Sequence, residues 1–168
     1  MARPDLLENL QRQVRESVQL GARVVLGGKR RAGRGVFFEP TILTNVTDAM
    51  PAFREETFGP VAAIIRAKDA DDAVRIANDS DFGLGAALWS GNIERAQQLA
   101  RRIEAGSVFI NGMVASDPRL PFGGVKRSGY GRELSAFGIR EFVNIQTIWV
   151  GPAQGQAAPP QKVAATVE

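Results

Sequence analysis

The sequence contains no cysteine and no histidine among its 168 residues. Without them the chain has no disulfide framework, no thiolate nucleophile and no zinc site of the usual thiolate or imidazole kind. Catalytic triads that rely on an imidazole base are excluded for the same reason. We therefore expect no metal centre, and any chemistry must use carboxylates, hydroxyls, amines or groups that another polypeptide supplies.

Neither sign of charge dominates, and long apolar runs are missing. The 21 Lys and Arg residues exceed the 18 Asp and Glu residues by a net charge of only +3, which argues against a nucleic-acid partner. The longest apolar run, residues 61–65, is far shorter than the roughly 20 residues of a membrane-spanning helix, so no membrane partner is expected. Residues 1–5 lead into a polar segment rather than a secretory signal, which predicts a cytoplasmic location.

The N-terminal part of the chain begins with a helical pattern over residues 5–20. Apolar residues recur at spacings of three and four on one predicted face: Leu7, Leu10, Val14 and Val18. Asp5 stands at the expected N-cap, Glu8 follows in capping-box register, and Gly21 is the expected stop. Two strands, residues 23–26 and 35–43, are expected after the helix, joined by a basic connection.

The middle of the chain alternates between strand and helix patterns. Strands are predicted at residues 61–66, 84–89 and 107–111, with helices at 69–78 and 92–103 between them. Short strands separated by helices of about ten residues predict parallel neighbours with right-handed crossovers. The expected fold class is therefore α/β, a βαβαβ parallel sheet with covering helices and a ligand at the carboxyl ends of the strands.

A glycine-rich loop at residues 112–131 and a helix at 132–137 complete the predicted domain of residues 1–140. Residues 141–150 read as an additional strand that is apolar on both faces, which predicts that another chain covers it. The remaining residues, 151–168, have no periodicity and are predicted to be a disordered tail.

Glu55 and Glu56 are the first candidate site residues. Adjacent side chains in an extended segment point to opposite faces, so at most one of the two carboxylates aims at a given ligand. An ionised carboxylate suits a vicinal diol such as a ribose, and Phe58 would share the face of Glu56. The alternative is a solvated pair of carboxylates without a ligand.

Polar residues at the end of the last predicted sheet strand and in the glycine-rich loop form a second candidate set. These are Asn111, Ser116, Arg119 and Lys126. They could orient an anionic ligand, or they could only satisfy the backbone of the loop itself. A further basic run at residues 29–34 has no interleaved aromatic residues, so a solvated turn is favoured there over nucleic-acid or phosphate binding.

Four motifs together resemble the C-terminal portion of the aldehyde dehydrogenase superfamily. They are residues 55–61 (EETFGPV), 78–86, 106–111 and 121–133 (PFGGVKRSGYGRE), in this order. The resemblance covers about residues 3–150. The wording of the loop at residues 116–119 is most similar to NAD(P)-dependent succinate-semialdehyde dehydrogenases.

The resemblance implies roles for several residues. The family oxidises aldehydes by cysteine attack, hydride transfer to a nicotinamide and hydrolysis with a glutamate base. Glu56 resembles the carboxylate that holds the nicotinamide ribose, and Phe58 the ring beside the nicotinamide. Ser116 resembles the hydroxyl that contacts the succinate-semialdehyde carboxylate, and Phe122 the aromatic wall of the aldehyde tunnel. Residues 144–150 resemble the oligomerisation strand that pairs with a neighbouring subunit.

In the family pattern the cysteine, the glutamate base and the cofactor domain precede the part that this chain resembles. We therefore expect the C-terminal part of an enzyme that uses NAD or NADP to oxidise an aldehyde, with succinate semialdehyde as the expected substrate. We expect it to be inactive alone, since it has no thiol. The expected partners are further copies or full-length aldehyde dehydrogenase subunits. The alternative is a non-catalytic interaction fragment that pairs with such subunits.

Overall fold

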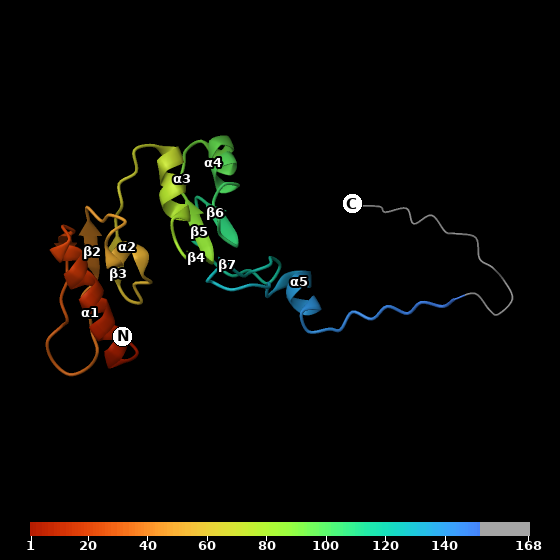
Figure 1. Ribbon diagram of the computed structural model, residues 1–168, viewed down its shortest axis with the longest axis horizontal. Coiled ribbons are helices and arrows are strands. Elements are labelled where there is room, and N and C mark those ends of the chain that lie inside the picture. Colours follow the sequence, from red (N-terminus) through yellow and green to blue (C-terminus); the bar gives the residue numbers. More distant parts are fainter. Residues whose placement is uncertain (152–168) are drawn as a thin grey trace.

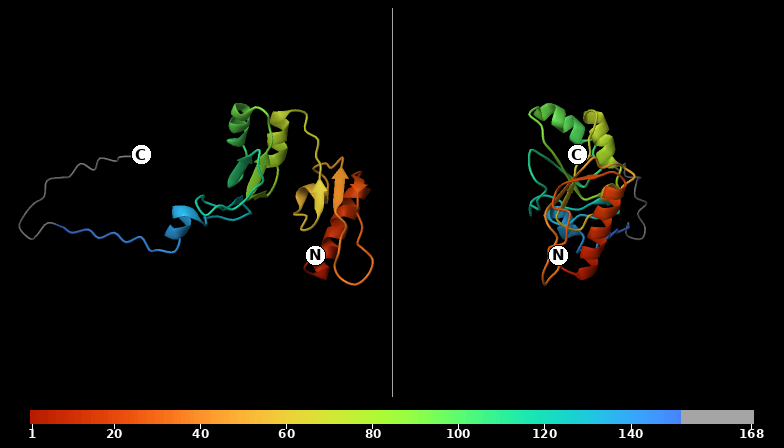
Figure 2. Two further views of the ribbon diagram at one scale, coloured as in Figure 1. Left: turned by 180° about the vertical axis from the view of Figure 1, so that it is seen from behind. Right: turned by 90° about the vertical axis from the view of Figure 1, so that its left-hand side faces the viewer.

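The computed structural model describes residues 1–151. These residues form an N-terminal unit, a central unit joined to it by a single loop, and an extended C-terminal segment (Figure 1). The view from behind shows the same order, with the loop between β3 and α3 as the connection (Figure 2). An ion pair between Arg54 and Asp79, at 2.8 Å, also joins the two units.

The N-terminal unit consists of two helices and a three-stranded sheet. Helix α1 spans Pro4–Gln19 and α2 spans Pro51–Arg54, and the strands are β1 (Arg23–Leu26), β2 (Thr41–Thr44) and β3 (Val61–Ala63). Strand β1 pairs antiparallel with β2, and β2 pairs parallel with β3. The helix at the start and the two strands after it are confirmed. The second strand is shorter than predicted because Pro40 lacks an N–H and Gly35 adopts a φ of +104°.

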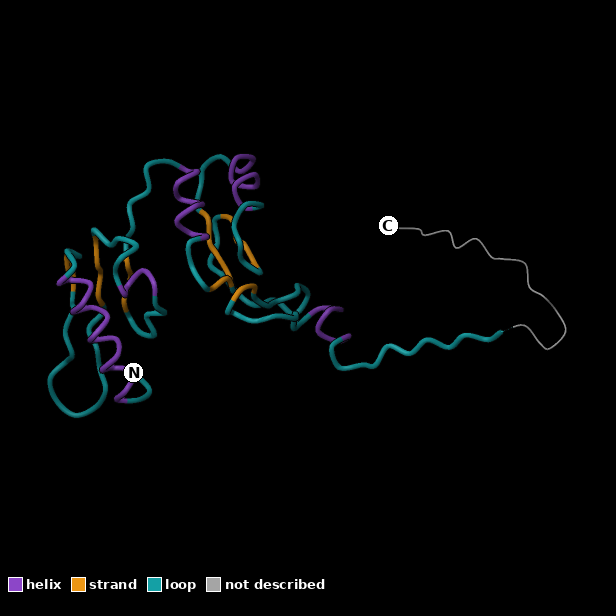
Figure 3. Tube along the Cα trace, viewed as in Figure 1, coloured by secondary structure: helices purple, strands orange, loops and turns teal. Residues whose placement is uncertain are grey.

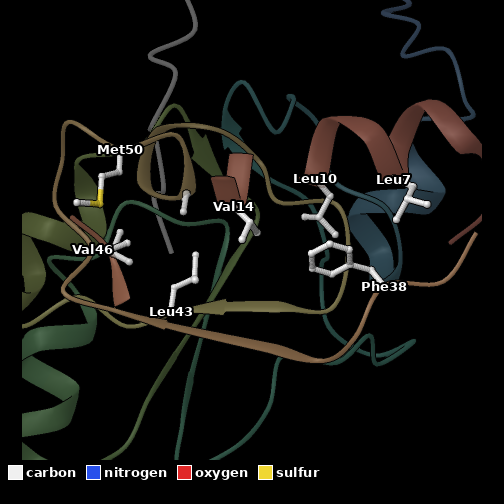
Figure 4. Close-up of a cluster of buried hydrophobic side chains, with 9 residues drawn as sticks. Leu7, Leu10, Val14, Phe38, Leu43, Val46 and Met50 are labelled. Atoms are coloured by element: carbon white, nitrogen blue, oxygen red, sulfur yellow. The ribbon is translucent and has the colours of Figure 1, made fainter. Parts of the chain in front are cut away.

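The main core lies between α1 and the sheet (Figure 4). It is formed by Leu7, Leu10, Val14, Phe38, Leu43, Val46 and Met50, all buried. The predicted inward face of α1 is partly wrong, because Val18 is 40% exposed whereas Gln13 and Ser17 are buried. A straight helix turns by 100° per residue, so positions 10, 13, 14 and 17 share a face that position 18 leaves.

Of the two predicted ends of α1, the N-terminal one is wrong and the C-terminal one is confirmed. The N-cap is Arg3 rather than Asp5, because Pro4 occupies the first helical turn and Asp5 instead forms an ion pair of 2.8 Å with Arg3. At the other end Gly21 has a φ of +110°, the left-handed conformation that glycine adopts without strain. The helix therefore ends where the sequence predicted.

The central unit contains α3 (Ala70–Asn78), β4 (Phe82–Gly83), β5 (Gly85–Leu88), α4 (Ile93–Ala100) and β6 (Ser107–Ile110). Strands β5 and β6 run parallel and in register. Both helices begin as the sequence predicts. The side chains of Asp69 and Asn92 accept hydrogen bonds from the backbone N–H groups three residues later.

The prediction of one βαβαβ parallel sheet is wrong within residues 1–151. Strand β3 pairs with β2, whereas β5 pairs with β6 in a separate two-stranded sheet. The backbone N–H of Ile64 continues the pairing with β2 by donating to the Leu43 carbonyl, at 2.8 Å. The chain then leaves the N-terminal unit before α3 begins (Figure 3). The three predicted strands exist, but the first belongs to a different sheet.

The C-terminal part begins with β7 (Val125–Lys126), which pairs antiparallel with β4, and continues with α5 (Ser135–Arg140). The helix starts three residues later than predicted, since Phe122 and Glu133 exchange backbone hydrogen bonds immediately before it. Residues 141–150 form no ladder with the described chain, so the predicted strand is not observed there. Apart from Gly151, the predicted disordered tail lies outside the described residues. Over residues 1–151, every helix is too short or too polar for a transmembrane span.

Candidate functional site

The carboxylate of Glu55 is attached to helix α1. Its Oε2 accepts hydrogen bonds from Arg12 Nη2 at 2.5 Å and from Gln13 Nε2 at 2.9 Å. These donors, first Arg12 and then Gln13, lower the pKa of Glu55 because they favour the ionised carboxylate. Since Glu55 has an extended backbone, the side chain of Glu56 points to the opposite face.

Glu56 is exposed, and its side chain makes no hydrogen bond with residues 1–151, while its backbone carbonyl accepts one from Gln13 Nε2 at 3.0 Å. Phe58 is 61% exposed and lines a cavity of about 340 Å³. The other lining residues are Met1, Ala2, Leu6, Phe37, Phe38, Gly59 and Pro60. A free carboxylate and an exposed ring two residues later fit a ribose diol with an attached planar group.

Ser116 lies exposed in the loop between β6 and β7, where its hydroxyl is open to a ligand. Arg119 in the same loop is held by Asp117, whose carboxylate accepts from Nε at 2.9 Å and from Nη2 at 2.6 Å. This pairing lowers the pKa of Asp117. Arg119 is therefore paired with Asp117, whereas the Ser116 hydroxyl makes no hydrogen bond with residues 1–151.

Phe122 is fixed by two backbone hydrogen bonds with Glu133, each 2.8 Å long. Its side chain lines two neighbouring cavities, of about 410 and 430 Å³. Tyr130 and Phe142 contribute to the first, and Phe109 and Leu120 contribute to the second. The second of these cavities has a mainly apolar lining, which suits the alkyl part of a small substrate.

Lys126 and Asn111 serve the backbone rather than a ligand. Lys126 Nζ donates to the carbonyls of Asn78 at 2.7 Å and Ser80 at 3.0 Å, and it pairs with Glu104 at 2.7 Å. The amide of Asn111 donates to the Ser90 carbonyl and accepts from the Ser90 N–H. The observed contacts match neither predicted alternative, because the backbone groups bound belong to Asn78, Ser80 and Ser90 and not to the glycine-rich loop.

The structure does not bring the two predicted pairs into one pocket. Phe58 lies in the N-terminal unit, next to β3, whereas Phe122 lies beside β7. Phe58 lines one of the three cavities and Phe122 lines the other two, and neither Glu56 nor Ser116 is a lining residue of any of them. Within the described residues no cluster of three or more acidic side chains could hold a metal ion.

Sequence reasoning missed two buried polar residues of α1, one that contacts Glu55 and Glu56 and one that contacts α2. Gln13 is only 1% exposed, and Ser17 is fully buried and accepts the backbone N–H of Ala52 at 3.0 Å. Their spacing of three and seven residues from Leu10 was a usable signal, since those positions share its face. Both side chains are polar, so a pattern of apolar residues does not include them.

A sequence profile described as "Aldehyde dehydrogenase family" matches residues 1–148. Among curated proteins, succinate semialdehyde dehydrogenase Sad of Escherichia coli (strain K12), named for NAD(P)+, is 57% identical over 89% of this chain and 32% of its own. A probable succinate-semialdehyde dehydrogenase of Synechocystis, named for NADP(+), is 49% identical over 89% of this chain and 33% of its own. The chain thus spans about a third of these relatives.

Two solved structures resemble the fold. Succinic semialdehyde dehydrogenase from Streptococcus pyogenes, in complex with NADP+, has a TM-score of 0.84 at 39% identity, over 89% of this chain and 33% of its own. An NAD-dependent aldehyde dehydrogenase from Sinorhizobium meliloti has a TM-score of 0.87 at 40% identity, over 95% and 31%. Profile, relatives and fold agree, and the chain therefore belongs to the aldehyde dehydrogenase family.

Proposed function

We propose that the chain is the C-terminal part of an NAD(P)-dependent aldehyde dehydrogenase that oxidises succinate semialdehyde to the carboxylic acid in the cytoplasm. The observation that carries the proposal is the exposed Glu56 carboxylate, which makes no hydrogen bond within residues 1–151, two residues before the exposed Phe58 ring. The family membership and the names of the relatives support the reaction class and the substrate.

On this proposal Glu56 and Phe58 hold the cofactor. The carboxylate accepts hydrogen bonds from the two ribose hydroxyls, and the ring gives an apolar surface to the planar group beside them. NAD or NADP, when bound, accepts the hydride that aldehyde oxidation releases. Preference between the two depends on groups that this site does not contain.

Ser116 and Phe122 bind the substrate. The Ser116 hydroxyl donates to the carboxylate of the semialdehyde, and Phe122 packs along its alkyl chain. Arg119 takes no direct part, since Asp117 already compensates its charge.

The chain alone does not complete the reaction. Aldehyde oxidation in this family requires a thiol that attacks the carbonyl, and the sequence contains no cysteine. The nucleophile, its base and the rest of the cofactor site come from the remaining two thirds of the enzyme.

A second candidate function, as an interaction fragment, is favoured by the C-terminal apolar tract, residues 142–150. Its apolar side chains are exposed in the described chain: Phe142, Val143, Ile145, Ile148, Trp149 and Val150. Such a segment pairs readily with the sheet of another polypeptide. We propose that it joins the chain to further copies or to full-length aldehyde dehydrogenase subunits.

A hybrid enzyme tests the catalytic proposal. Residues 1–148 replace the corresponding third of the E. coli Sad enzyme, which is 57% identical over the matched region. We expect the hybrid to reduce NAD(P)+ when succinate semialdehyde is added, and the isolated chain to give no such signal. In the hybrid, Glu56→Gln should raise the KM for the cofactor roughly ten- to hundredfold, as expected for the loss of a charged acceptor.

Glu8→Gln is the matched control, because it removes an exposed carboxylate of α1 without touching residues 55–58. A folded hybrid that does not turn over would contradict the proposed reaction. Equal cofactor KM values for Glu56→Gln and Glu8→Gln would contradict the role of Glu56.

A further inference from the structure

We propose that Gln13 is a positioning residue for the cofactor, because it fixes the direction in which the Glu56 carboxylate points. The inference rests on the proposed function and deepens it. Gln13 itself lies in the core of the N-terminal unit and contacts Glu55 and Glu56 from the side of α1.

Gln13 occupies a place where an apolar side chain would be expected. It is 1% exposed, on the same face of α1 as Leu10 and Val14. Its Oε1 is buried and has no hydrogen-bond partner among residues 1–151. A buried unpaired carbonyl costs stability, and an apolar side chain of similar size would avoid that cost. The contribution of Gln13 to the core therefore does not explain this residue.

The amide nitrogen of Gln13 contacts two consecutive residues of the site. Nε2 donates to Glu55 Oε2 at 2.9 Å and to the Glu56 carbonyl at 3.0 Å. One NH₂ group has two hydrogens, so both are used. The side chain of one residue and the main chain of the next are thus fixed to the same atom of α1.

This double contact determines the direction of Glu56. With Glu55 held against α1 by Gln13 and Arg12, the side chain of the next residue must point away from the helix. Phe58, two residues further, lies on a different side, where it lines a cavity together with Met1, Ala2 and Leu6 at the start of α1. The contacts of Gln13 therefore act on the direction of the Glu56 carboxylate.

Residues 55–59 have few other attachments. Their remaining backbone hydrogen bonds are local: Glu55 N–H donates to the Pro51 carbonyl at 2.9 Å, Gly59 N–H donates to the Thr57 carbonyl at 2.8 Å, and the Gly59 carbonyl accepts from Val61 N–H at 2.8 Å. Within residues 1–151, the hydrogen bonds from this segment to another element all come from Arg12 and Gln13. Removing Gln13 should therefore loosen the segment specifically.

Hydrogen–deuterium exchange on the purified chain tests this looseness. Gln13→Met keeps the length of the side chain and removes both donors. Ser17→Ala is the matched control, since it also removes a buried polar contact of α1, one turn further on, to Ala52 of α2. We expect Gln13→Met to speed exchange at residues 55–59 about tenfold and Ser17→Ala to speed it around Ala52 instead.

Arg12→Met is a second variant that leaves the core intact, since Arg12 lies at the surface. It removes one of the two contacts to Glu55 and should speed exchange at residues 55–59 by a smaller factor. The positioning role is overturned if neither Gln13→Met nor Arg12→Met changes exchange there relative to Ser17→Ala.

The hybrid enzyme tests the link to the cofactor. Gln13→Met should raise the KM for NAD(P)+ about fivefold or more, with the KM for the aldehyde unchanged, whereas Ser17→Ala should change neither constant. An unchanged cofactor KM in an active Gln13→Met hybrid overturns the inference. A wild-type hybrid without turnover refutes the proposed function instead, and the exchange experiment still decides whether Gln13 positions the segment.

Discussion

Gly106 and Gly123 approach each other so closely that a Cβ atom on residue 106 would overlap the Gly123 carbonyl oxygen. Gly106 immediately precedes β6, and Gly123 follows Phe122 in the glycine-rich loop. The start of the strand therefore sets the position of the loop that carries the proposed substrate wall. Only a residue without a side chain permits this approach.

Gly106→Ala should destabilise the chain by about 1–3 kcal/mol, because the new methyl group meets backbone that cannot rotate away. Urea unfolding followed by tryptophan fluorescence measures the change. Gly91→Ala is the control, since a Cβ atom there meets nothing within 4 Å. Equal midpoints for the two variants would contradict the proposed close packing.

Lys126→Met should destabilise the chain by about 1–2 kcal/mol, because it removes the donors to the carbonyls at the end of α3 and the ion pair with Glu104. Methionine retains most of the side-chain length, so lost packing contributes little. Lys68→Met, on the exposed loop before α3, is the control for the loss of a positive charge. A smaller loss of stability for Lys126→Met than for Lys68→Met would show that these contacts of Lys126 contribute nothing.

Glu55 should make stability fall in acid. Its pKa is lowered in the folded chain, so its contribution is present above the ordinary value of 4.5 and is lost as the pH falls through the folded value. Glu55→Gln should lower the unfolding midpoint near neutral pH and bring it closer to that of the wild type as the pH falls below 4.5. Urea midpoints between neutral pH and acid test this, and a constant difference across the range would contradict it.

The C-terminal apolar tract should control self-association. Ile145→Asp combined with Ile148→Asp places a charge on each face of the segment, so it should abolish the association of chains. Light scattering after size-exclusion chromatography measures the mass. Gln11→Asp with Gln98→Asp adds the same charge on the exposed surfaces of α1 and α4. A monomeric wild-type chain, or equal masses for both double variants, would count against the proposed role.

The local features of the fold could be predicted from the sequence. Asp69 and Asn92 begin their helices and Gly21 ends α1, because caps and left-handed glycines depend on neighbours a few residues away. The partner of β3 could not be predicted, because an apolar strand pattern does not state which strand lies beside it. The strand expected at residues 141–150 lacks a partner within the described chain, and no local pattern supplies one.

The candidate site shows the same division. The opposite faces of Glu55 and Glu56 followed from backbone geometry, whereas the choice between them depends on Arg12 and Gln13, more than 40 residues earlier. Position 13 shares the face of Leu10, but an apolar pattern selects Val18 for that face and leaves out Gln13 because it is polar. Long-range hydrogen bonds of this kind become visible only when the helix and the segment are placed together.

In the two-stranded sheet of β5 and β6, both strands are edge strands with one unpaired side within residues 1–151. Unpaired edge strands act as templates, and copies of the same polypeptide can pair with them. Aggregation by this route increases with concentration. The yield of the polypeptide should therefore improve when it is co-expressed with a chain that pairs with these edge strands. The amount of polypeptide recovered during purification would then depend on how soon after synthesis the covering chain binds.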